Sequence, residues 1–370
     1  MSIDPFAFTD EFGPEKIIHL AAEMPKIRAI VVIDNTARGP AIGGTRMAVN
    51  ATLEECARLA RGMTLKNAAA DLPHGGAKSV ILSDHRVPDV DKEQLLRAFA
   101  RLIGALPDYI PGPDMGTDEQ SMSWVHDEIG RAVGLPAEQG GIPLDEIGAT
   151  GFGVAAAAQV AQEFGDISLD GARLAVQGFG AVGQHAARFL VDKGCVLVAA
   201  GDSRGTLHDP SGIAVDELIE TKVSGRAVCE HSKGETLGRD DIIGVDCDIW
   251  IPAARPDVLT GDTVGRLKAK LVVQGANIPV TREAERMLYG RGVVSVPDFI
   301  ANAGGVICAS VEHQRGSREA AFAAIEEKIT RNTRTVLENS RSQGIPPHKA
   351  AGNLAKQRVR EAMPCGTPEK

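Results

Sequence analysis

Two lysines, Lys66 and Lys78, lie twelve residues apart in the stretch LKNAAADLPHGGAKS, among alanines and glycines. These small neighbours provide little side-chain bulk, but they let a small substrate lie close to the backbone. One ammonium would pair with a substrate carboxylate, and its positive charge would depress the pKa of the second lysine. A lysine whose pKa falls by roughly 2 to 3 units can act as a base near neutral pH. A single lysine near a helix end is more often a solvated charge, so this prediction rests on the pair.

Two further polar residues accompany the lysines. Asp114 lies in the segment PDYIPGPDMGTDE, which is expected to be a loop, where an aspartate is more often a turn or cap residue. Beside two lysines it becomes a candidate proton shuttle. His74 lies between Pro73 and Gly75, and a lone histidine is more often structural, although a polar group here would also change the polarity of the site.

The segment VQGFGAVG carries Gly178, Gly180 and Gly183 in GxGxxG spacing, between a predicted strand and the predicted helix AVGQHAARFLVDKG. In such a motif the first glycine permits a tight turn, the second lets the backbone approach a pyrophosphate, and the third allows close helix packing. A bare glycine turn of an α/β domain is the alternative interpretation. The strand and helix context favours a dinucleotide site.

The residue that selects the cofactor is expected at the end of the next strand. Asp202 follows that strand, 24 residues after Gly178, and a carboxylate there accepts hydrogen bonds from the adenine ribose hydroxyls of NAD. Arg204 leaves NADP open, because an arginine two residues beyond the acid would hold a 2′-phosphate. NAD is therefore the predicted cofactor, and NADP is the alternative.

Composition excludes several classes of protein. The chain has 370 residues and a formal net charge of -9, with no basic face, so a nucleic-acid partner is not expected. The N-terminus has no signal-peptide pattern and no run of 18 apolar residues occurs, so we expect a cytoplasmic protein without a membrane partner. No metal is expected, because the cysteines are dispersed and should be reduced thiols: Cys56, Cys195, Cys229, Cys247, Cys308 and Cys365.

The order of elements predicts an α/β protein of two domains. IRAIVVID reads as a strand, a helix begins after Thr52 with Glu55 completing a capping box, and Lys78 is expected to open a strand after a glycine turn. From about Gly148 to Asp298, helices alternate with short apolar strands, which is typical of a parallel sheet of the Rossmann type. We expect a substrate-binding and assembly domain over residues 1–137, completed by C-terminal helices in 331–370. A dinucleotide-binding domain is expected over 138–330, with the active site in the cleft between the two.

Several segments together resemble one known family, in family order and over nearly the whole chain. GPAIGGTRM, RGMTLKNAAADLPHGGAKSVIL, PDMGTDEQ, ATGFGV, VQGFGAVG, VVQGAN and VPDFIANAGGV are similar to motifs of the glutamate/leucine/phenylalanine/valine dehydrogenases. The resemblance implies reversible oxidative deamination of an L-amino acid by NAD(P), giving a 2-oxo acid and ammonia. It also implies a homo-oligomer, of a size that the sequence does not give.

The resemblance assigns roles residue by residue. Lys66 matches the lysine that binds the substrate α-carboxylate, Lys78 the lysine that activates water, and Asp114 the proton-transfer aspartate. The remaining substrate-binding candidates are Ile42, Gly43, Gly44, Asn277 and Ala309. The cofactor-binding candidates are Thr150, Gly178, Gly180, Ala181, Val182, Gly183, Asp202, Ser203, Ala253, Asn277 and Asn302.

Two of these positions bear on which amino acid is the substrate. Ile42 stands where glutamate-specific members have a lysine for the side-chain carboxylate, and Ala309 stands where they have an assisting serine. A buried glutamate carboxylate without partners would cost several kcal/mol. An apolar or aromatic substrate, of the leucine, valine or phenylalanine type, is therefore predicted. The alternatives are a glutamate dehydrogenase whose cation comes from elsewhere and a non-catalytic nucleotide-binding sensor or scaffold.

Overall fold

The computed structural model describes residue 4 and residues 6–363, and it divides the chain into two compact units. The first unit comprises Met1–Pro143, Ala309–Ala320 and Leu354–Lys370, and the second comprises Leu144–Cys308 and Ala321–Asn353. The first boundary lies six residues beyond the expected one at 137/138. The C-terminal division differs from the expected segment 331–370 because three helices each contribute residues to both units, namely α9 (Gly304–His313), α10 (Arg318–Gln343) and α11 (Pro347–Ala362).

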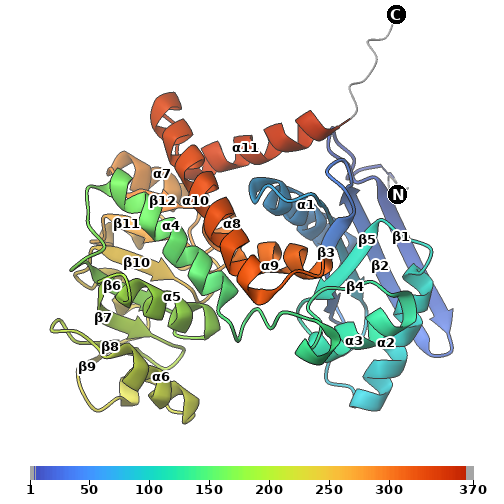
Figure 1. Cartoon of the computed structure of the whole chain (residues 1–370), viewed down its shortest axis with the longest axis horizontal. Coiled ribbons are helices and arrows are strands. Elements are labelled where there is room, and N and C mark those ends of the chain that lie inside the picture. The colour runs from blue at the N-terminus through green and yellow to red at the C-terminus, as the bar shows by residue number, and fades with distance from the viewer. Residues whose placement is uncertain (1–3, 5, 364–370) are drawn as a thin grey trace, which may run out of the picture. The chain divides into compact units, whose positions relative to one another are not determined.

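A five-stranded mixed sheet forms the centre of the first unit, in the order β1-β2-β4-β3-β5 (Figure 1). Strand β2 pairs antiparallel with both β1 and β4, whereas β3 pairs parallel with both β4 and β5. The strands are β1 (Lys16–Glu23), β2 (Lys26–Asn35), β3 (Ala41–Met47), β4 (Gly75–Ile81) and β5 (Tyr109–Pro113). The predicted strand IRAIVVID is therefore confirmed as β2.

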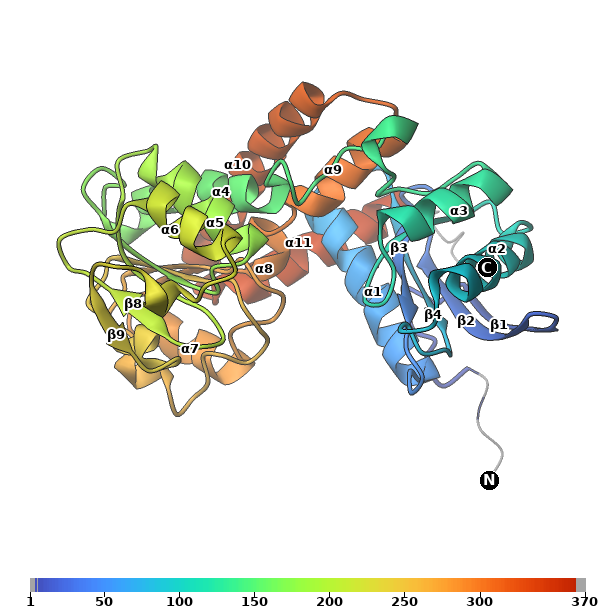
Figure 2. The same ribbon diagram turned by 90° about the horizontal axis from the view of Figure 1, so that it is seen from below.

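Helices cover both faces of this sheet, with α1 on one side and α2 and α3 on the other (Figure 2). Apolar residues of β2 and β4 alternate between the two faces, so that one core lies under α1 and a second under α2 and α3. The helices are α1 (Leu53–Ala69), α2 (Asp89–Ile103) and α3 (Glu119–Ile129). Thr52 caps α1, as predicted, by accepting a hydrogen bond from the backbone of Glu55 at 3.1 Å. The predicted capping box is not completed, because the Glu55 side chain pairs with Arg46 instead.

Two sequence-based expectations for this unit are wrong. Lys78 lies in the middle of β4 rather than at its start, because Gly75 and Gly76 belong to the strand and not to a turn. A Cβ on Gly76 would lie 2.0 Å from the backbone nitrogen of Thr64, so the glycine is there to let α1 approach the strand. The segment expected as a proline-rich loop contains β5, and prolines fit there because β5 is an edge strand that needs fewer backbone donors.

The second unit contains a seven-stranded sheet in the order β12-β11-β10-β6-β7-β8-β9. The five strands from β12 to β7 in this order are parallel, which confirms the prediction of a wound parallel sheet. Strands β8 and β9 extend the sheet in antiparallel fashion. The strands are β6 (Arg173–Gln177), β7 (Val196–Gly201), β8 (Thr206–His208), β9 (Glu235–Leu237), β10 (Ile249–Pro252), β11 (Leu271–Val273) and β12 (Val294–Val296).

The core of the second unit gathers around Trp250 on β10, the largest of its fully buried side chains. Helix α4 packs against α5 and against β11 and β12, while α7 packs against β12. The α-helices are α4 (Ala149–Gly165), α5 (Ala181–Val191), α6 (Val215–Val223), α7 (Arg282–Gly290) and α8 (Asp298–Ala301), followed by α9 (Gly304–His313), α10 (Arg318–Gln343) and α11 (Pro347–Ala362). Short 3₁₀ helices are η1 (Ala137–Gln139), η2 (Val228–Glu230), η3 (Asp241–Gly244) and η4 (Val264–Arg266).

No helix within residues 4 and 6–363 is long and apolar enough to cross a membrane. Five of the six cysteines are free thiols, and Cys365 lies outside the described residues, as do residues 364–370 of the expected C-terminal segment.

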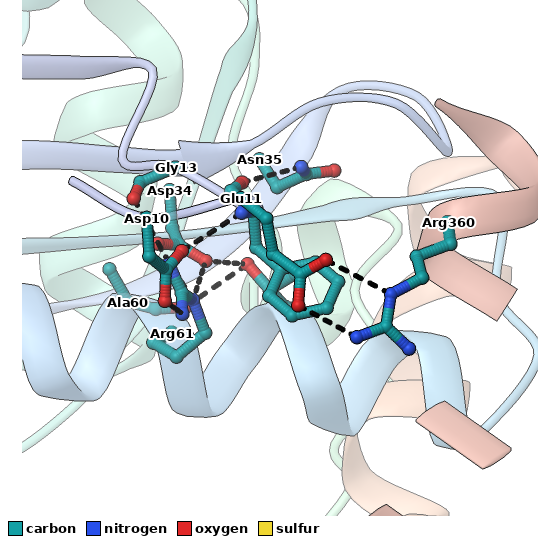
Figure 3. Close-up of polar contacts among 10 residues, drawn as sticks. Asp10, Glu11, Gly13, Asp34, Asn35, Ala60, Arg61 and Arg360 are labelled. Carbon is teal, nitrogen blue, oxygen red and sulfur yellow. Dashed lines mark hydrogen bonds and ion pairs between the residues drawn. The ribbon is translucent and has the colours of Figure 1, made fainter. Parts of the chain in front are cut away.

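A buried ion pair fastens α1 to β2 and to the segment before β1 (Figure 3). The Nε of Arg61 donates to both carboxylate oxygens of Asp34, at 3.1 and 2.8 Å, and its terminal nitrogens donate to Asp10 at 2.7 Å. Burial raises the pKa of Asp34, and the hydrogen bonds from Arg61 and Thr64 only partly oppose that effect. The Arg61 guanidinium therefore compensates a charge that water does not reach.

Replacing Arg61 with methionine should lower the free energy of unfolding by about 3 kcal/mol, because it leaves the buried Asp34 carboxylate without its cation. Urea unfolding followed by circular dichroism measures the change. Arg360→Met is the matched control, since Arg360 pairs with the exposed Glu11, and it should leave the unfolding midpoint unchanged. Equal effects of the two substitutions would contradict this account.

Candidate functional site

Lys78 and Asp114, predicted separately from the sequence, form an ion pair in the first unit. The ammonium of Lys78 points from the centre of β4 to the Oδ2 atom of Asp114, which directly follows β5. Lys78 is only 4% exposed. Asp114 is held in place because its backbone nitrogen donates to Thr117 Oγ1 at 3.0 Å and that hydroxyl donates to the carbonyl of Thr45 at 2.7 Å. The structure thus brings these two candidates into direct contact, and their catalytic role remains a prediction.

Arg46 and Glu55 extend the ion pair into a row of four alternating charges. The Nε of Arg46 donates to Asp114 Oδ1 at 2.8 Å, and its Nη1 pairs with Glu55. Burial alone would raise the pKa of Asp114, but Lys78 and Arg46 outweigh burial and hold it below its usual value. Asp114 is therefore ionised at neutral pH and shares one hydrogen bond with the Lys78 ammonium.

Sequence reasoning missed Arg46 and Glu55 as members of this row. Arg46 lies in the quoted segment GPAIGGTRM but received no role, and Glu55 was considered only as a helix-capping residue. The signal that could have found Arg46 is electrostatic. A carboxylate expected to face a buried lysine benefits from a second cation, and an arginine on a neighbouring strand can supply one.

Gly44 leaves the space that the ion pair occupies. A Cβ at this position would lie 2.9 Å from the Asp114 Cβ and 3.0 Å from the Lys78 Nζ. A glycine is needed at position 43 for a different reason, because a Cβ there would lie 1.7 Å from the carbonyl oxygen of Ala77. Gly44 is therefore required by the ion pair, and Gly43 by the packing of neighbouring strands. A contact of either glycine with the substrate remains a prediction.

Lys66 lies in the last turn of α1, the helix that packs on β4, and it is partly exposed. The close approach of α1 to β4 occurs where Thr64 meets Gly76, two residues before Lys66 on the helix and two before Lys78 on the strand. Asn67 fixes the same end of the helix by donating to the Gly75 carbonyl at 2.6 Å. The two lysines therefore lie near the same contact between α1 and β4.

The two residues expected to shape the side-chain pocket lie in one apolar cluster. Ile42, Ile110 and Val133 are buried, and Ala309 packs against them while remaining partly exposed. Ile42 and Ile110 are neighbours across the β3–β5 ladder. Sequence reasoning named Ile42 and Ala309 but not their two partners.

His74 immediately precedes β4 and is buried. Its Nδ1 lies 3.2 Å from the carbonyl oxygen of Pro40, and its Nε2 lies 3.0 Å from Ser310 Oγ. Burial lowers the pKa of His74 to about 4, against the Pro40 contact that raises it, and His313, at a ring distance of 5.6 Å, lowers it further. His74 is therefore neutral at pH 7.

The three motif glycines of the second unit adopt the geometry expected of a dinucleotide loop. Gly178 has φ of +97°, a conformation that favours glycine, and forms the tight turn. Open space lies where Gly180 would carry a Cβ, so a ligand can approach its backbone. A Cβ on Gly183 would lie 1.9 Å from the Gly178 carbonyl oxygen, so this glycine lets α5 pack closely. Ala181 and Val182 lie in the first turn of α5.

A cavity of about 360 Å³ adjoins this loop, wholly within the second unit. Five predicted cofactor residues line it, namely Gly178, Gly180, Asp202, Ser203 and Ala253. Sequence reasoning missed its cations, Lys222, Arg239 and Arg255, since they come from distant segments. The cavity can therefore hold a negatively charged nucleotide.

Asp202 is firmly held at the edge of this cavity. Its Oδ2 accepts from Lys222 Nζ at 2.8 Å and from the Val228 backbone at 3.0 Å. Burial would raise the pKa of Asp202, but these bonds outweigh burial and lower it, so it is ionised and available to a ribose hydroxyl. The Arg204 side chain bonds the Gly225 carbonyl at 3.1 Å and pairs with Glu230.

Two buried amide oxygens of the second unit, Gln177 Oε1 and Asn302 Oδ1, have no hydrogen-bond partner among the described residues. Gln177 lines the cavity, and Asn302 donates to Asn277 Oδ1 at 3.0 Å. Thr150 lies in the first turn of α4, beside Gly304 and Gly305. An unpaired acceptor on the wall of the cavity is what a bound dinucleotide with amide and hydroxyl donors would satisfy, so Gln177 fits the predicted cofactor.

Comparison with known families identifies two matches. The model described as Glu/Leu/Phe/Val dehydrogenase, dimerisation domain, matches residues 16–131, and the model described as Glutamate/Leucine/Phenylalanine/Valine dehydrogenase matches residues 140–365. The two models together cover both units. The first description implies an oligomer.

Among curated relatives, a glutamate dehydrogenase of Aeropyrum pernix is 37% identical, over 89% of this chain and 84% of its own. A leucine dehydrogenase of Bacillus subtilis is 36% identical, over 96% of this chain and 93% of its own. An NAD-specific glutamate dehydrogenase of Staphylococcus aureus is 34% identical, over 89% and 83%. Most of the named relatives are glutamate dehydrogenases, with the leucine enzyme at similar identity.

Two solved structures share the fold. The hetero-hexameric glutamate dehydrogenase of Thermus thermophilus, in a leucine-bound form, has a TM-score of 0.82 and 30% identity, covering 95% of this chain and 89% of its own. The L-tryptophan dehydrogenase of Nostoc punctiforme has a TM-score of 0.77 and 29% identity, covering 95% and 97%. The α/β fold with two domains is thereby confirmed.

The neutral His74 makes stability depend on pH. Because its folded-state pKa of about 4 lies below the ordinary value of 6.5, protonation favours the unfolded chain. The stabilisation is complete above about pH 6.5 and is lost as the pH falls towards 4, by up to about 3 kcal/mol. Urea unfolding at several pH values in this window measures the slope. His74→Gln should flatten it, and an unchanged slope in that variant would contradict the assignment.

Proposed function

This chain belongs to the Glutamate/Leucine/Phenylalanine/Valine dehydrogenase family and is an amino acid dehydrogenase, and on that premise we propose its substrate class and cofactor. The reaction is the reversible, NAD-dependent oxidative deamination of an L-amino acid with an apolar or aromatic side chain, which yields the 2-oxo acid and ammonia. The observation that carries this choice is the apolar cluster of Ile42, Ile110, Val133 and Ala309.

The substrate carboxylate is assigned to the Lys66 ammonium. Lys66 is partly exposed at the end of α1, on the helix that packs on the strand of Lys78. An ammonium provides a point charge for a small carboxylate. The assignment requires the reacting carbon to lie near the Lys78 and Asp114 pair. It is supported by the positions of Lys66 and Lys78, each two residues beyond the contact of Thr64 with Gly76.

Proton movement is assigned to the hydrogen bond between Lys78 Nζ and Asp114 Oδ2. Passing one proton from Nζ to Oδ2 gives a neutral amine, which takes a proton from the water that attacks the imine carbon of the substrate. The Asp114 carboxyl then donates its proton to the nitrogen, which gives the neutral carbinolamine. The hydroxyl proton of the carbinolamine passes through the Asp114 carboxylate to the nitrogen as the C–N bond breaks, so that the 2-oxo acid forms and ammonia leaves. Lys78 ends as an ammonium and Asp114 as a carboxylate, as both began, so the pair is regenerated.

The cofactor is assigned to the cavity beside the glycine loop, where it supplies the acceptor for the hydride of the substrate α-carbon. Asp202 supports NAD, because an ionised carboxylate at the cavity edge accepts from ribose hydroxyls and repels a 2′-phosphate. Lys222 and Arg239 line the same cavity and support NADP as the second candidate. A non-catalytic sensor is disfavoured, since nucleotide binding alone does not require the Lys78 and Asp114 pair.

Glutamate is the second candidate substrate, and the names of most relatives favour it. Against it, the aliphatic side chains of Ile42 and Ala309 provide no partner for a side-chain carboxylate. Burying that carboxylate unpaired would cost several kcal/mol, which corresponds to about a thousandfold or more in selectivity. A cation from elsewhere in the chain would have to remove this cost.

The test is the formation of reduced cofactor with leucine, valine, phenylalanine, tryptophan and glutamate, each with NAD and with NADP. The wild-type protein should prefer an apolar or aromatic substrate over glutamate by at least about a hundredfold in kcat/KM. Ile42→Lys should shift the ratio towards glutamate, because it introduces the missing cation. Ile42→Leu, which conserves volume, is the control and should leave the ratio nearly unchanged.

Preferred turnover of glutamate by the wild-type protein would overturn the substrate assignment in favour of the second candidate. No shift in Ile42→Lys would show that residue 42 does not face the substrate side chain. Turnover of no amino acid in the panel, with nucleotide binding intact, would instead support the sensor alternative.

A further inference from the structure

The hydrogen bonds of His74 have a defined direction. The Pro40 carbonyl oxygen can only accept, so the proton of the neutral imidazole lies on Nδ1 and is donated to Pro40 at 3.2 Å. Nε2 is then the acceptor, and the hydroxyl of Ser310 donates to it at 3.0 Å. His74 therefore links the residue before β3, the start of β4 and helix α9 through one side chain.

These links run beside the apolar cluster assigned to the substrate side chain. Ser310 is the residue after Ala309, and Pro40 lies two residues before Ile42. Both Ala309 and Ile42 belong to the cluster. The His74 bridge thus joins the two chain segments whose side chains meet there, and its length constrains how closely Ala309 approaches Ile42.

A second buried anchor holds the same part of α9 from another direction. The Glu312 carboxylate accepts from the backbone nitrogens of Gly134, Leu135 and Ile142, at 2.7 to 3.0 Å. Gly134 adjoins Val133, the remaining cluster residue with Ile110. Glu312 fixes one side of α9, and the hydrogen bond of His74 to Ser310 fixes another side of the same helix.

We propose that His74 is a positioning residue for substrate selectivity, which acts through Ser310 to set the space between Ala309 and Ile42 that the substrate side chain enters. This inference rests on the proposed function. His74 and Ser310 are each about 3% exposed, so they act on the substrate through Ala309 rather than by touching it. The hydroxyl-to-imidazole bond resembles that of a nucleophile and its base, but its burial suits a structural link.

The test compares selectivity rather than activity. His74→Met and Ser310→Ala remove the bond from opposite ends, whereas His74→Gln retains one donor and one acceptor. His19→Met, at an exposed histidine of β1, is the matched control. For each purified full-length protein, kcat/KM is measured for valine, leucine and phenylalanine with NAD. The ratio between substrates cancels any loss of folded enzyme, so a merely destabilising effect does not change it.

We expect His74→Met and Ser310→Ala to change the phenylalanine-to-valine ratio at least about fivefold in the same direction, because side-chain fit in an apolar pocket is sensitive to small displacements. The double variant should change it no further than either single variant, since both remove one bond. His74→Gln and His19→Met should remain within about twofold of the wild type.

A ratio unchanged in both His74→Met and Ser310→Ala would overturn the inference while leaving the proposed function intact. A His74→Gln variant that behaves like His74→Met would also overturn it, because the hydrogen bonds would not be the cause. If His74→Met does not fold, Ser310→Ala decides the result alone. A wild-type protein that turns over none of these amino acids would remove the proposed function, and this inference with it.

Discussion

The buried ammonium of Lys78 is the constraint on which the rest of the site depends. An ammonium in the middle of a fully buried strand would cost several kcal/mol without a counter-charge. Asp114 provides that charge from the segment after β5, Arg46 pairs with the other oxygen of Asp114, and Glu55 balances Arg46 in turn. Gly44 leaves room for the pair, and Thr117 fixes the loop that carries Asp114. Stability and proton chemistry thus require the same geometry.

The alternating charges also explain why the pair suits proton transfer. Lys78 and Arg46, which donate to different oxygens of the Asp114 carboxylate, together keep it ionised despite its burial. A proton can pass between Nζ and Oδ2 without a change in net charge of the row. Desolvation makes each step sensitive to its partners, because charges interact more strongly away from water.

The sequence predicted those features that follow from local pattern. The roles of Gly178 and Gly183 in turn and helix packing, the β2 strand and the Thr52 cap each follow from residue type and short-range spacing. The start of β4 was placed wrongly, because Gly75 and Gly76 lie within the strand and do not form a turn. Gly76 is required there by the close approach of α1. Arg46, Ile110 and Ser310 were missed as site residues, since their roles depend on contacts between segments far apart in the chain.

Substrate choice depends on a few side chains within a shared framework. Relatives named for glutamate and for leucine match this chain at similar identity, so overall similarity does not separate the two substrates. On the proposed assignment, the difference lies in whether the side-chain pocket offers a charge, and the aliphatic Ile42 and Ala309 offer none. His74 adds directed hydrogen bonds to Pro40 and Ser310 beside that cluster.

The central claim is that Lys78 and Asp114 act as one proton-transferring unit, and a double-mutant cycle in kcat tests it most directly. Lys78→Gln, Asp114→Asn and the double variant are compared with the wild-type protein, with urea unfolding followed by circular dichroism as the measure of intact folding. If the pair acts as a unit, the double variant loses about as much as either single variant, since removing one partner already disables the other. Losses that add in free energy would contradict the account, because the two groups would then contribute independently.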